Sequence, residues 1–307
     1  MAELSIGDAV GTGFEIIRRK PLVVLSWGLI ELLFAAATLA LFGSVYVDII
    51  TQAWANAQNG TSTSPEALAR VMQMQGASFL LSFGGGFVRI VVLCAVFRSV
   101  LHPEASRFAY LRVGAAEVFL FLLLFAAYIA FVMALIIPAI FFGIVIAALA
   151  MSHAGAAAAI VGVVAVIALL VAIFYVALRF SLVGPMMVDD GKFHLFDAWA
   201  LTRRHVAGLF LVALILFAIL IIGEIVVGLV LMLSGLGVLS SAAGGVTHIE
   251  AFFHQPVPVI LGALAPFLVI MGIVWVPVTG CAFAIAGAPW AKAYRDLSGP
   301  DLAATFS

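Results

Sequence analysis

Three charged side chains, Glu31, Arg89 and Glu224, fall inside long apolar stretches of the sequence. A charge within a membrane helix is costly and usually marks a functional site or a buried ion pair. Arg89 lies nine residues before Arg98, and Glu31 lies eleven residues after Lys20. At 1.5 Å per residue, both charges are therefore about 13–16 Å from a basic helix end. Because the two segments run antiparallel, we expect Glu31 and Arg89 to form an ion pair.

Two kinds of chemistry are open to these charges. The Glu31–Arg89 pair is either a structural clamp, which is the simpler interpretation, or part of a proton or substrate path. Glu224 has no basic residue at its predicted depth. It is therefore either a neutral carboxyl group or a group that faces a water-filled cavity.

No sequence pattern supports catalysis or a cofactor. His248, Glu250 and His254 share an outer loop, but their spacing matches no standard set of metal ligands. Cys94 and Cys281 both lie in apolar segments, where we expect buried small hydrophobic residues. The chain also lacks a nucleophile elbow, a phosphate-binding loop and a Cys/His cluster. We predict that the protein is not an enzyme and holds no metal or cofactor.

The composition places these residues in a membrane protein. Hydrophobic residues make up 65% of the chain and charged residues 9%, against about 45–50% and 25% in a soluble domain. Mean hydropathy is +1.28, and several uncharged runs exceed the ~20 residues that a helix needs to cross a bilayer. The prediction is an all-α, polytopic integral membrane protein with six transmembrane helices and cytoplasmic amphipathic elbow helices. No basic patch stands outside the membrane flanks, which argues against a nucleic-acid partner.

The membrane segments are predicted near 21–49, 77–100, 115–150, 156–183, 206–233 and 258–288. A short helix is expected to start at Pro65, after Ser64 as its N-cap. We divide the single membrane domain, 1–307, into an interfacial helix at 3–20, a helical hairpin at 21–100, an elbow and hairpin at 101–183, an elbow and hairpin at 184–290, and a cytoplasmic tail at 291–307. The odd-numbered segments begin about 90–95 residues apart, which indicates either a weak threefold repeat or simply three hairpins.

Two of the elbows have the pattern of helices that lie in the membrane interface. In the first, the predicted apolar face carries Ile6, Val10, Phe14 and Ile17, and the polar face carries Asp8, Thr12, Glu15 and Arg19. In the third, residues 179–205 hold the densest run of charge, with a polar stripe of Asp190, His194, Asp197 and Arg204. A single interfacial helix is expected there.

Basic residues set the orientation. With both termini in the cytoplasm, the inside flanks hold twelve of the 14 Lys and Arg residues: Arg18, Arg19, Lys20, Arg98, Arg107, Arg112, Arg179, Lys192, Arg203, Arg204, Lys292 and Arg295. Arg70 is then outside and Arg89 is within the membrane, as the positive-inside rule favours. The candidates for contact with lipid headgroups are Arg18, Arg19, Lys20, Lys192, Arg203 and Arg204.

The third elbow also resembles a known family. It is similar to a family of bacterial multi-pass membrane proteins of largely unknown activity, and the matching residues are Arg179-Phe180, Pro185, Asp197-Ala198-Trp199 and Thr202 before the basic pair. These proteins resemble the membrane domain that is fused to some glycerophosphoryl diester phosphodiesterases. Phe14, the Arg18-Arg19 pair and Pro21 are similar to the opening elbow of that family. The fused enzymes carry a separate soluble barrel with metal ligands, which this chain does not encode. The resemblance therefore implies the membrane fold without the phosphodiesterase activity.

We expect a non-catalytic protein of the bacterial inner membrane. It would organise lipid or scaffold membrane partners through elbows that bind the anionic cytoplasmic leaflet. Membrane lipids are the expected partners, with other membrane proteins or further copies of the chain as additional ones. The alternative is a transporter or lipid-translocating protein with a polar path at Glu31, Arg89 and Glu224.

Overall fold

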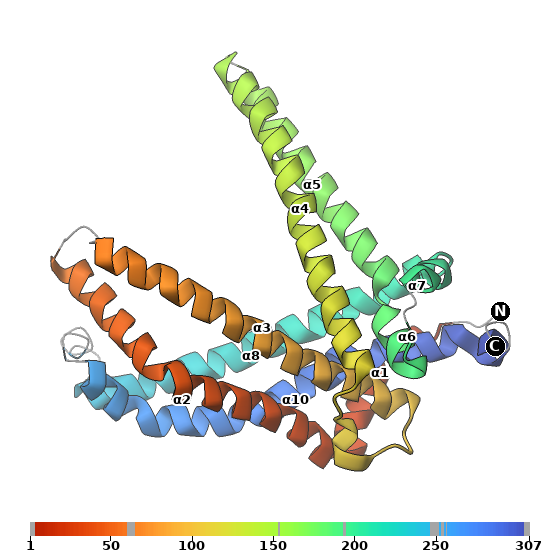
Figure 1. The fold of residues 1–307 in the computed structure, drawn as a ribbon, viewed down its shortest axis with the longest axis horizontal. Helices are drawn as coiled ribbons and strands as arrows, with labels where there is room; N and C mark the ends of the chain where they lie inside the picture. The colour runs from red at the N-terminus through yellow and green to blue at the C-terminus, as the bar shows by residue number, and fades with distance from the viewer. Residues whose placement is uncertain are drawn as a thin grey trace. The chain divides into compact units, whose positions relative to one another are not determined.

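The computed structural model describes residues 4–59, 65–152, 154–192, 195–245, 252, 255 and 257–303. These residues form helices and no strands (Figure 1). Six of the described helices are long and apolar enough to cross a membrane, which confirms the predicted fold class. Several residues that the sequence singled out lie outside the described ones: Ser64, His194, His248, Glu250 and His254.

The helices follow the predicted order. They are α1 (Ile6–Arg19), α2 (Pro21–Asn59), α3 (Pro65–Leu101), the 3-10 helix η1 (Arg107–Tyr110), α4 (Ala115–Met151), α5 (Gly155–Phe180), α6 (Val183–Asp190), α7 (Leu195–Thr202), α8 (Val206–Ala243) and α10 (Val257–Ala303). The apolar spans are Pro21–Gly43, Leu81–Leu101, Arg107–Leu149, Gly155–Asp190, Val206–Ala243 and Gly262–Ser298. The third covers η1 and α4, and the fourth covers α5 and α6.

Three features differ in detail from the sequence prediction. The helix that starts at Pro65 is not short, because it continues without a break through the second membrane segment as the 37-residue α3. The third elbow is not one interfacial helix but two, α6 and α7. Gly191 separates them with a left-handed φ of 72°, a conformation that ends a helix and that glycine adopts at little cost. The predicted tail begins inside α10, which extends to Ala303.

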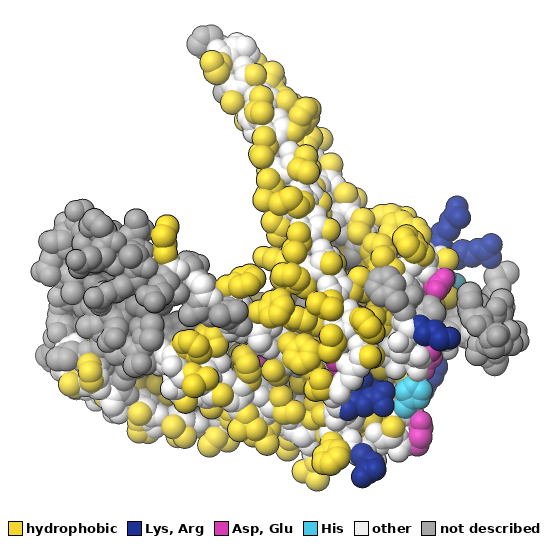
Figure 2. All heavy atoms as spheres, viewed as in Figure 1, with side chains coloured by type: hydrophobic (Ala, Val, Ile, Leu, Met, Phe, Trp, Pro, Cys, Tyr) yellow, Lys and Arg dark blue, Asp and Glu magenta, His cyan; other side chains and the backbone are white. Residues whose placement is uncertain are grey.

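The chain forms two compact units. Unit 1 comprises Met1–Ala9, Cys94–Ala213 and Pro289–Ser307, and unit 2 comprises Val10–Leu93 and Leu214–Ala288. In unit 1, α4 packs along α5 as a hairpin, and α6 and α7 pack against these helices. Hydrophobic side chains cover the α4–α5 hairpin along most of its length, whereas Lys and Arg side chains gather near α6 and α7 (Figure 2). The end of α5 packs with parts of α8 and α10 in a buried cluster of Leu178, Leu182, Leu209, Ala293 and Leu297.

In unit 2, α2 and α10 approach each other through glycines. A Cβ added at Gly28 would overlap the carbonyl oxygen of Val276, and one added at Gly280 would overlap the carbonyl oxygen of Val24. Each helix therefore places a glycine against the backbone of the other, as small residues allow in membrane proteins. Next to this contact, the Trp27 side chain is completely buried.

We predict that Gly28→Ala destabilises the protein, because its methyl group has no space against the α10 backbone. Overpacking of this kind costs about 1–3 kcal/mol. The measurement is an SDS titration of the purified protein, followed by tryptophan fluorescence. Gly228→Ala on α8 is the matched control, since a Cβ there meets nothing within 4 Å. Equal unfolding midpoints for the two variants would contradict the close contact.

Candidate functional site

The ion pair predicted within the membrane is present in unit 2. Glu31 lies on α2 and Arg89 on α3, and 3.7 Å separates the Arg89 Nε from the Glu31 Oε1. The Glu31 side chain is only 11% exposed, whereas the Arg89 side chain is 71% exposed. Phe34 packs against the same stretch of α3, where a Cβ added at Gly85 would lie 3.2 Å from its ring. The pair therefore links the two helices and leaves most of the Arg89 side chain accessible.

The other residues that the sequence singled out within the membrane are not part of this pair. Glu224 is exposed on α8 and makes no ion pair among the residues that the structure describes. Cys94 is buried, as predicted, while Cys281 is only partly buried. Within the described ranges, no three His, Cys, Asp or Glu side chains form a group that could hold a metal ion.

A second ion pair, in unit 1, is fully buried and joins the end of α3 to the start of α4. Arg98 pairs through Nη2 with the Glu117 Oε1. Arg98 Nη1 also donates to the Tyr110 carbonyl at 3.1 Å, and Glu117 Oε2 accepts a hydrogen bond from the Gly114 N–H at 2.9 Å. The sequence prediction treated Arg98 only as a membrane flank and missed Glu117. The sequence does carry a signal for Glu117. Gly114 precedes α4, and an acidic residue three positions later is half of a capping box.

This ion pair supports a loop with a strained backbone. The φ angles of Phe108, Ala109 and Tyr110 are 50°, 55° and 65°, and a left-handed conformation costs a residue with a side chain roughly 1–2 kcal/mol. Tyr110 is held on both sides, because its carbonyl accepts from Arg98 and its hydroxyl donates to the Pro103 carbonyl at 2.9 Å. As a result the loop presents Phe108 to the outside, with its side chain 82% exposed.

A second buried arginine, Arg179 near the end of α5, is stabilised without a carboxylate. It is 2% exposed, and its guanidinium carbon lies 4.2 Å from the centre of the Trp199 ring on α7. Its Nη1 lies 3.4 Å from the Thr202 hydroxyl oxygen. Among the described residues it forms no ion pair, and its Nε has no hydrogen-bond partner. The cation–π contact with Trp199 therefore partly stabilises the buried positive charge, as a carboxylate would.

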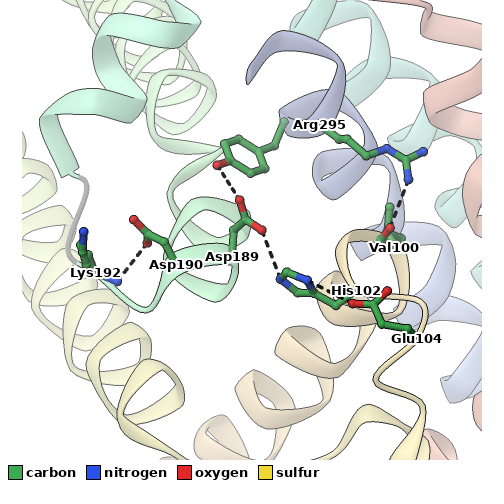
Figure 3. A network of polar contacts seen from close by, with 8 residues as sticks. Val100, His102, Glu104, Asp189, Asp190, Lys192 and Arg295 are labelled. Atoms are coloured by element: carbon green, nitrogen blue, oxygen red, sulfur yellow. Dashed lines mark hydrogen bonds and ion pairs between the residues drawn. The ribbon is translucent and has the colours of Figure 1, made fainter. Parts of the chain in front are cut away.

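A polar network connects the ends of α3, α6 and α10 in unit 1 (Figure 3). The Tyr294 hydroxyl donates to the Asp189 Oδ2 at 3.0 Å, and the Asp189 Oδ1 lies 3.1 Å from the His102 Nε2. The other ring nitrogen of His102 lies 3.7 Å from the Glu104 Oε1. Arg295 donates to a carbonyl oxygen at the end of α3 at 3.2 Å. The network therefore ties the three helix ends together.

The α1 helix has three distinct faces. Its buried face carries Ala9, Gly13 and Ile16, and Gly13 lies against the α10 backbone. The predicted apolar face, Ile6, Val10, Phe14 and Ile17, is instead partly or fully exposed. At 3.6 residues per turn, these two faces are about a quarter of a turn apart. One side of α1 therefore packs on the protein while the neighbouring apolar side remains accessible.

The headgroup candidates lie at helix ends. Arg18, Arg19, Lys192, Arg203 and Arg204 are exposed, and Lys20 is half-buried. Each elbow also exposes an aromatic side chain near its arginines: Phe14 in the first, Phe108 in the second and Phe196 in the third. Phe196 is 81% exposed, almost as much as Phe108.

We predict that Glu117→Gln lowers the free energy of unfolding by about 3–5 kcal/mol, because it leaves the Arg98 guanidinium buried without a counter-charge. The glutamine oxygen can still accept from Gly114, so the change isolates the charge. The double variant Arg98→Met/Glu117→Leu should recover much of the loss. Glu15→Gln is the control, because it breaks the exposed Arg19–Glu15 pair, which is worth about 0–1 kcal/mol. If Glu117→Gln unfolds at the same SDS concentration as Glu15→Gln, the buried pair is not formed.

Comparison of the chain with protein-family models, curated proteins and solved structures found no match. The resemblance of the third elbow to the bacterial multi-pass family stays a prediction. The function must therefore be inferred from the geometry of the residues themselves.

Proposed function

We propose that this protein is a non-catalytic protein of the bacterial inner membrane that organises anionic lipid through three interfacial elbows, with both termini in the cytoplasm. The elbows are residues 6–20, 102–114 and 181–205. One observation carries the proposal, namely that each elbow exposes a large apolar side chain near two exposed arginines. Aromatic and basic residues at the end of a membrane helix favour the headgroup region of an anionic leaflet.

The faces of α1 support a position within the membrane interface. Its exposed apolar face lies roughly opposite the face that carries Asp8, Glu15 and Arg19. An interfacial helix needs this arrangement, with one side toward the acyl chains and the other toward water. Packing through Gly13 fixes α1 to the protein and leaves both sides at least partly exposed.

The backbone of the second elbow supports the same role. Strain in a loop persists only where the surrounding structure holds it, and it is concentrated at functional sites. Here the strained residues keep Phe108 pointing outward, while Arg107 and Arg112 on either side are exposed. A relaxed loop could place this phenylalanine against the protein, so we interpret its exposure as an anchor for the leaflet.

Each elbow can contribute enough energy to select lipid. A basic residue near an anionic leaflet is worth about 1 kcal/mol, and burying a phenylalanine side chain in apolar surroundings is worth about 1.5–3 kcal/mol. The two arginines therefore give each elbow a preference of about 2 kcal/mol for an anionic leaflet, and the aromatic residue holds them at the interface. This is sufficient to enrich anionic lipid around the protein.

A second candidate function, translocation of lipid headgroups, is favoured by the accessible side chain of Arg89. A cation so exposed within an apolar span could attract a phosphate group. The neighbouring Glu31 argues against it, because its carboxylate already neutralises part of that charge.

We predict that neutralising the first two elbows reduces the enrichment of anionic lipid around the protein. The variants are Arg18→Gln/Arg19→Gln and Arg107→Gln/Arg112→Gln, and each removes two charges worth about 1 kcal/mol apiece at the leaflet. The measurement is electron paramagnetic resonance of spin-labelled phosphatidylglycerol and phosphatidylcholine in proteoliposomes. The wild-type protein should retain more motionally restricted phosphatidylglycerol, and each variant should lose about a third of that difference, because it neutralises one of three elbows.

The aromatic anchors are tested in the same assay. Phe108→Ala should reduce the preference, because Phe108 holds the arginines of its elbow at the leaflet. Phe141→Ala should leave the preference unchanged, because Phe141 is also exposed but lies within the apolar α4. No preference for phosphatidylglycerol in the wild-type protein would rule out the proposed function.

The two candidate functions differ in a lipid-scrambling assay. We predict that proteoliposomes containing the wild-type protein move a fluorescent phospholipid between leaflets no faster than protein-free vesicles, as reported by dithionite quenching. Faster movement that is lost in Arg89→Gln would instead establish translocation. Tyr128→Ala, an accessible change in the apolar part of α4, is the control for altered packing against lipid.

A further inference from the structure

A pocket of about 540 Å³ opens at the third elbow, where α7 ends and α8 begins. It is lined by Trp199, Ala200, Leu201, Arg203, Arg204 and His205. Among these residues are two guanidinium groups and an imidazole ring, and none is acidic. Asp197, the acidic residue of α7, is not part of the lining. The volume lies within the range of small-molecule sites, about 300–1,000 Å³.

The backbone of this pocket is fixed by hydrogen bonds. The Thr202 hydroxyl lies within donating distance of the Arg179 carbonyl, at 3.0 Å, and of the Ala198 carbonyl, at 2.9 Å. The His205 N–H donates to the Thr202 carbonyl at 3.0 Å and so closes the turn. Thr202 is itself completely buried. The basic side chains therefore project from a rigid turn.

A buried cation lies behind the aromatic wall of the pocket. Arg179 stacks on Trp199 and has no ion-pair partner among the described residues, so its charge is not cancelled locally. Trp199 is held from two further sides, by the rings of Phe180 and Tyr175 at 5.1 and 6.4 Å between centroids. The pocket thus combines an aromatic wall with the two guanidinium groups that line it, and a third guanidinium, that of Arg179, stacks on the ring of that wall.

We infer that this pocket binds the phosphate group of an anionic lipid headgroup, and a phosphomonoester in preference to a phosphodiester. Arginine donors match phosphate oxygens in pairs. A phosphomonoester offers three terminal oxygens and a charge near −2, whereas a phosphodiester offers two oxygens and one charge. The pocket is larger than a phosphate group, and Leu201 and Trp199 provide apolar contacts for the glycerol part. The inference rests on the proposed function, since it places the third elbow at the leaflet surface.

The test is a lipid titration of the full-length protein in detergent, followed by native mass spectrometry. The probes are phosphatidic acid, phosphatidylglycerol and phosphatidylcholine. The wild-type protein should bind one phosphatidic acid more tightly than either other lipid. Arg203→Lys/Arg204→Lys keeps both charges but removes the paired donors, so it should weaken binding at least about tenfold. Arg295→Lys changes an exposed arginine of α10 that lies outside the three elbows, and it should leave binding within about twofold.

Three outcomes would overturn the inference. Equal weakening in Arg203→Lys/Arg204→Lys and in Arg295→Lys would mean that arginine donors anywhere on the surface, and not this pocket, hold the lipid. Phosphatidylglycerol binding as tightly as phosphatidic acid would remove the preference for a phosphomonoester. Inorganic phosphate that displaces phosphatidic acid at equal concentration would show a site for the free anion. In each case the spin-label result for the first two elbows still decides the proposed function independently.

Discussion

The hydrocarbon core of a bilayer offers no partner to a backbone N–H or C=O group, so a chain can cross it only as hydrogen-bonded helices or as a closed barrel of strands. The described part of this chain forms helices. The rest of this structure follows from that constraint. Long helices such as α4 and α5 can be covered with hydrophobic side chains, and most polar side chains collect where helices end. There the backbone is free to turn and buried charges can find partners, so the chemical variety of the chain lies in its elbows.

Two elbows solve the same electrostatic problem in different ways. Arg98 and Arg179 are both buried near helix ends. Arg98 is neutralised by Glu117, whereas Arg179 lies on the ring of Trp199. An ion pair leaves no net charge at its site, because the two charges balance each other. A cation–π contact leaves the positive charge in place, so Arg179 keeps its charge whereas that of Arg98 is balanced by Glu117.

The membrane segments and one intramembrane contact could be predicted from the sequence. Long apolar runs identify spanning helices whatever their packing, and matched depths were sufficient to pair Glu31 with Arg89. Features that depend on packing could not be predicted. The left-handed backbone at Phe108 has no glycine to signal it, and the contact of Arg179 with Trp199 has no opposite charge in the sequence to indicate it. The accessible apolar face of α1 was found, but its buried face was not, because Ala9 and Gly13 are too small to register as a hydrophobic stripe.

The glycine contact between α2 and α10 also has a consequence for the order of assembly. Its two sides, Gly28 and Val276, are separated by about 250 residues, which a ribosome takes roughly 10–50 s to synthesise. During that interval the α2 surface that will meet α10 has no protein neighbour from this contact, and lipid or an insertion factor must cover it. The first membrane helix, α2, thus gains this packing partner only when α10, one of the last helices, is made. A nascent chain released before α10 would leave the α2 surface around Gly28 without that partner.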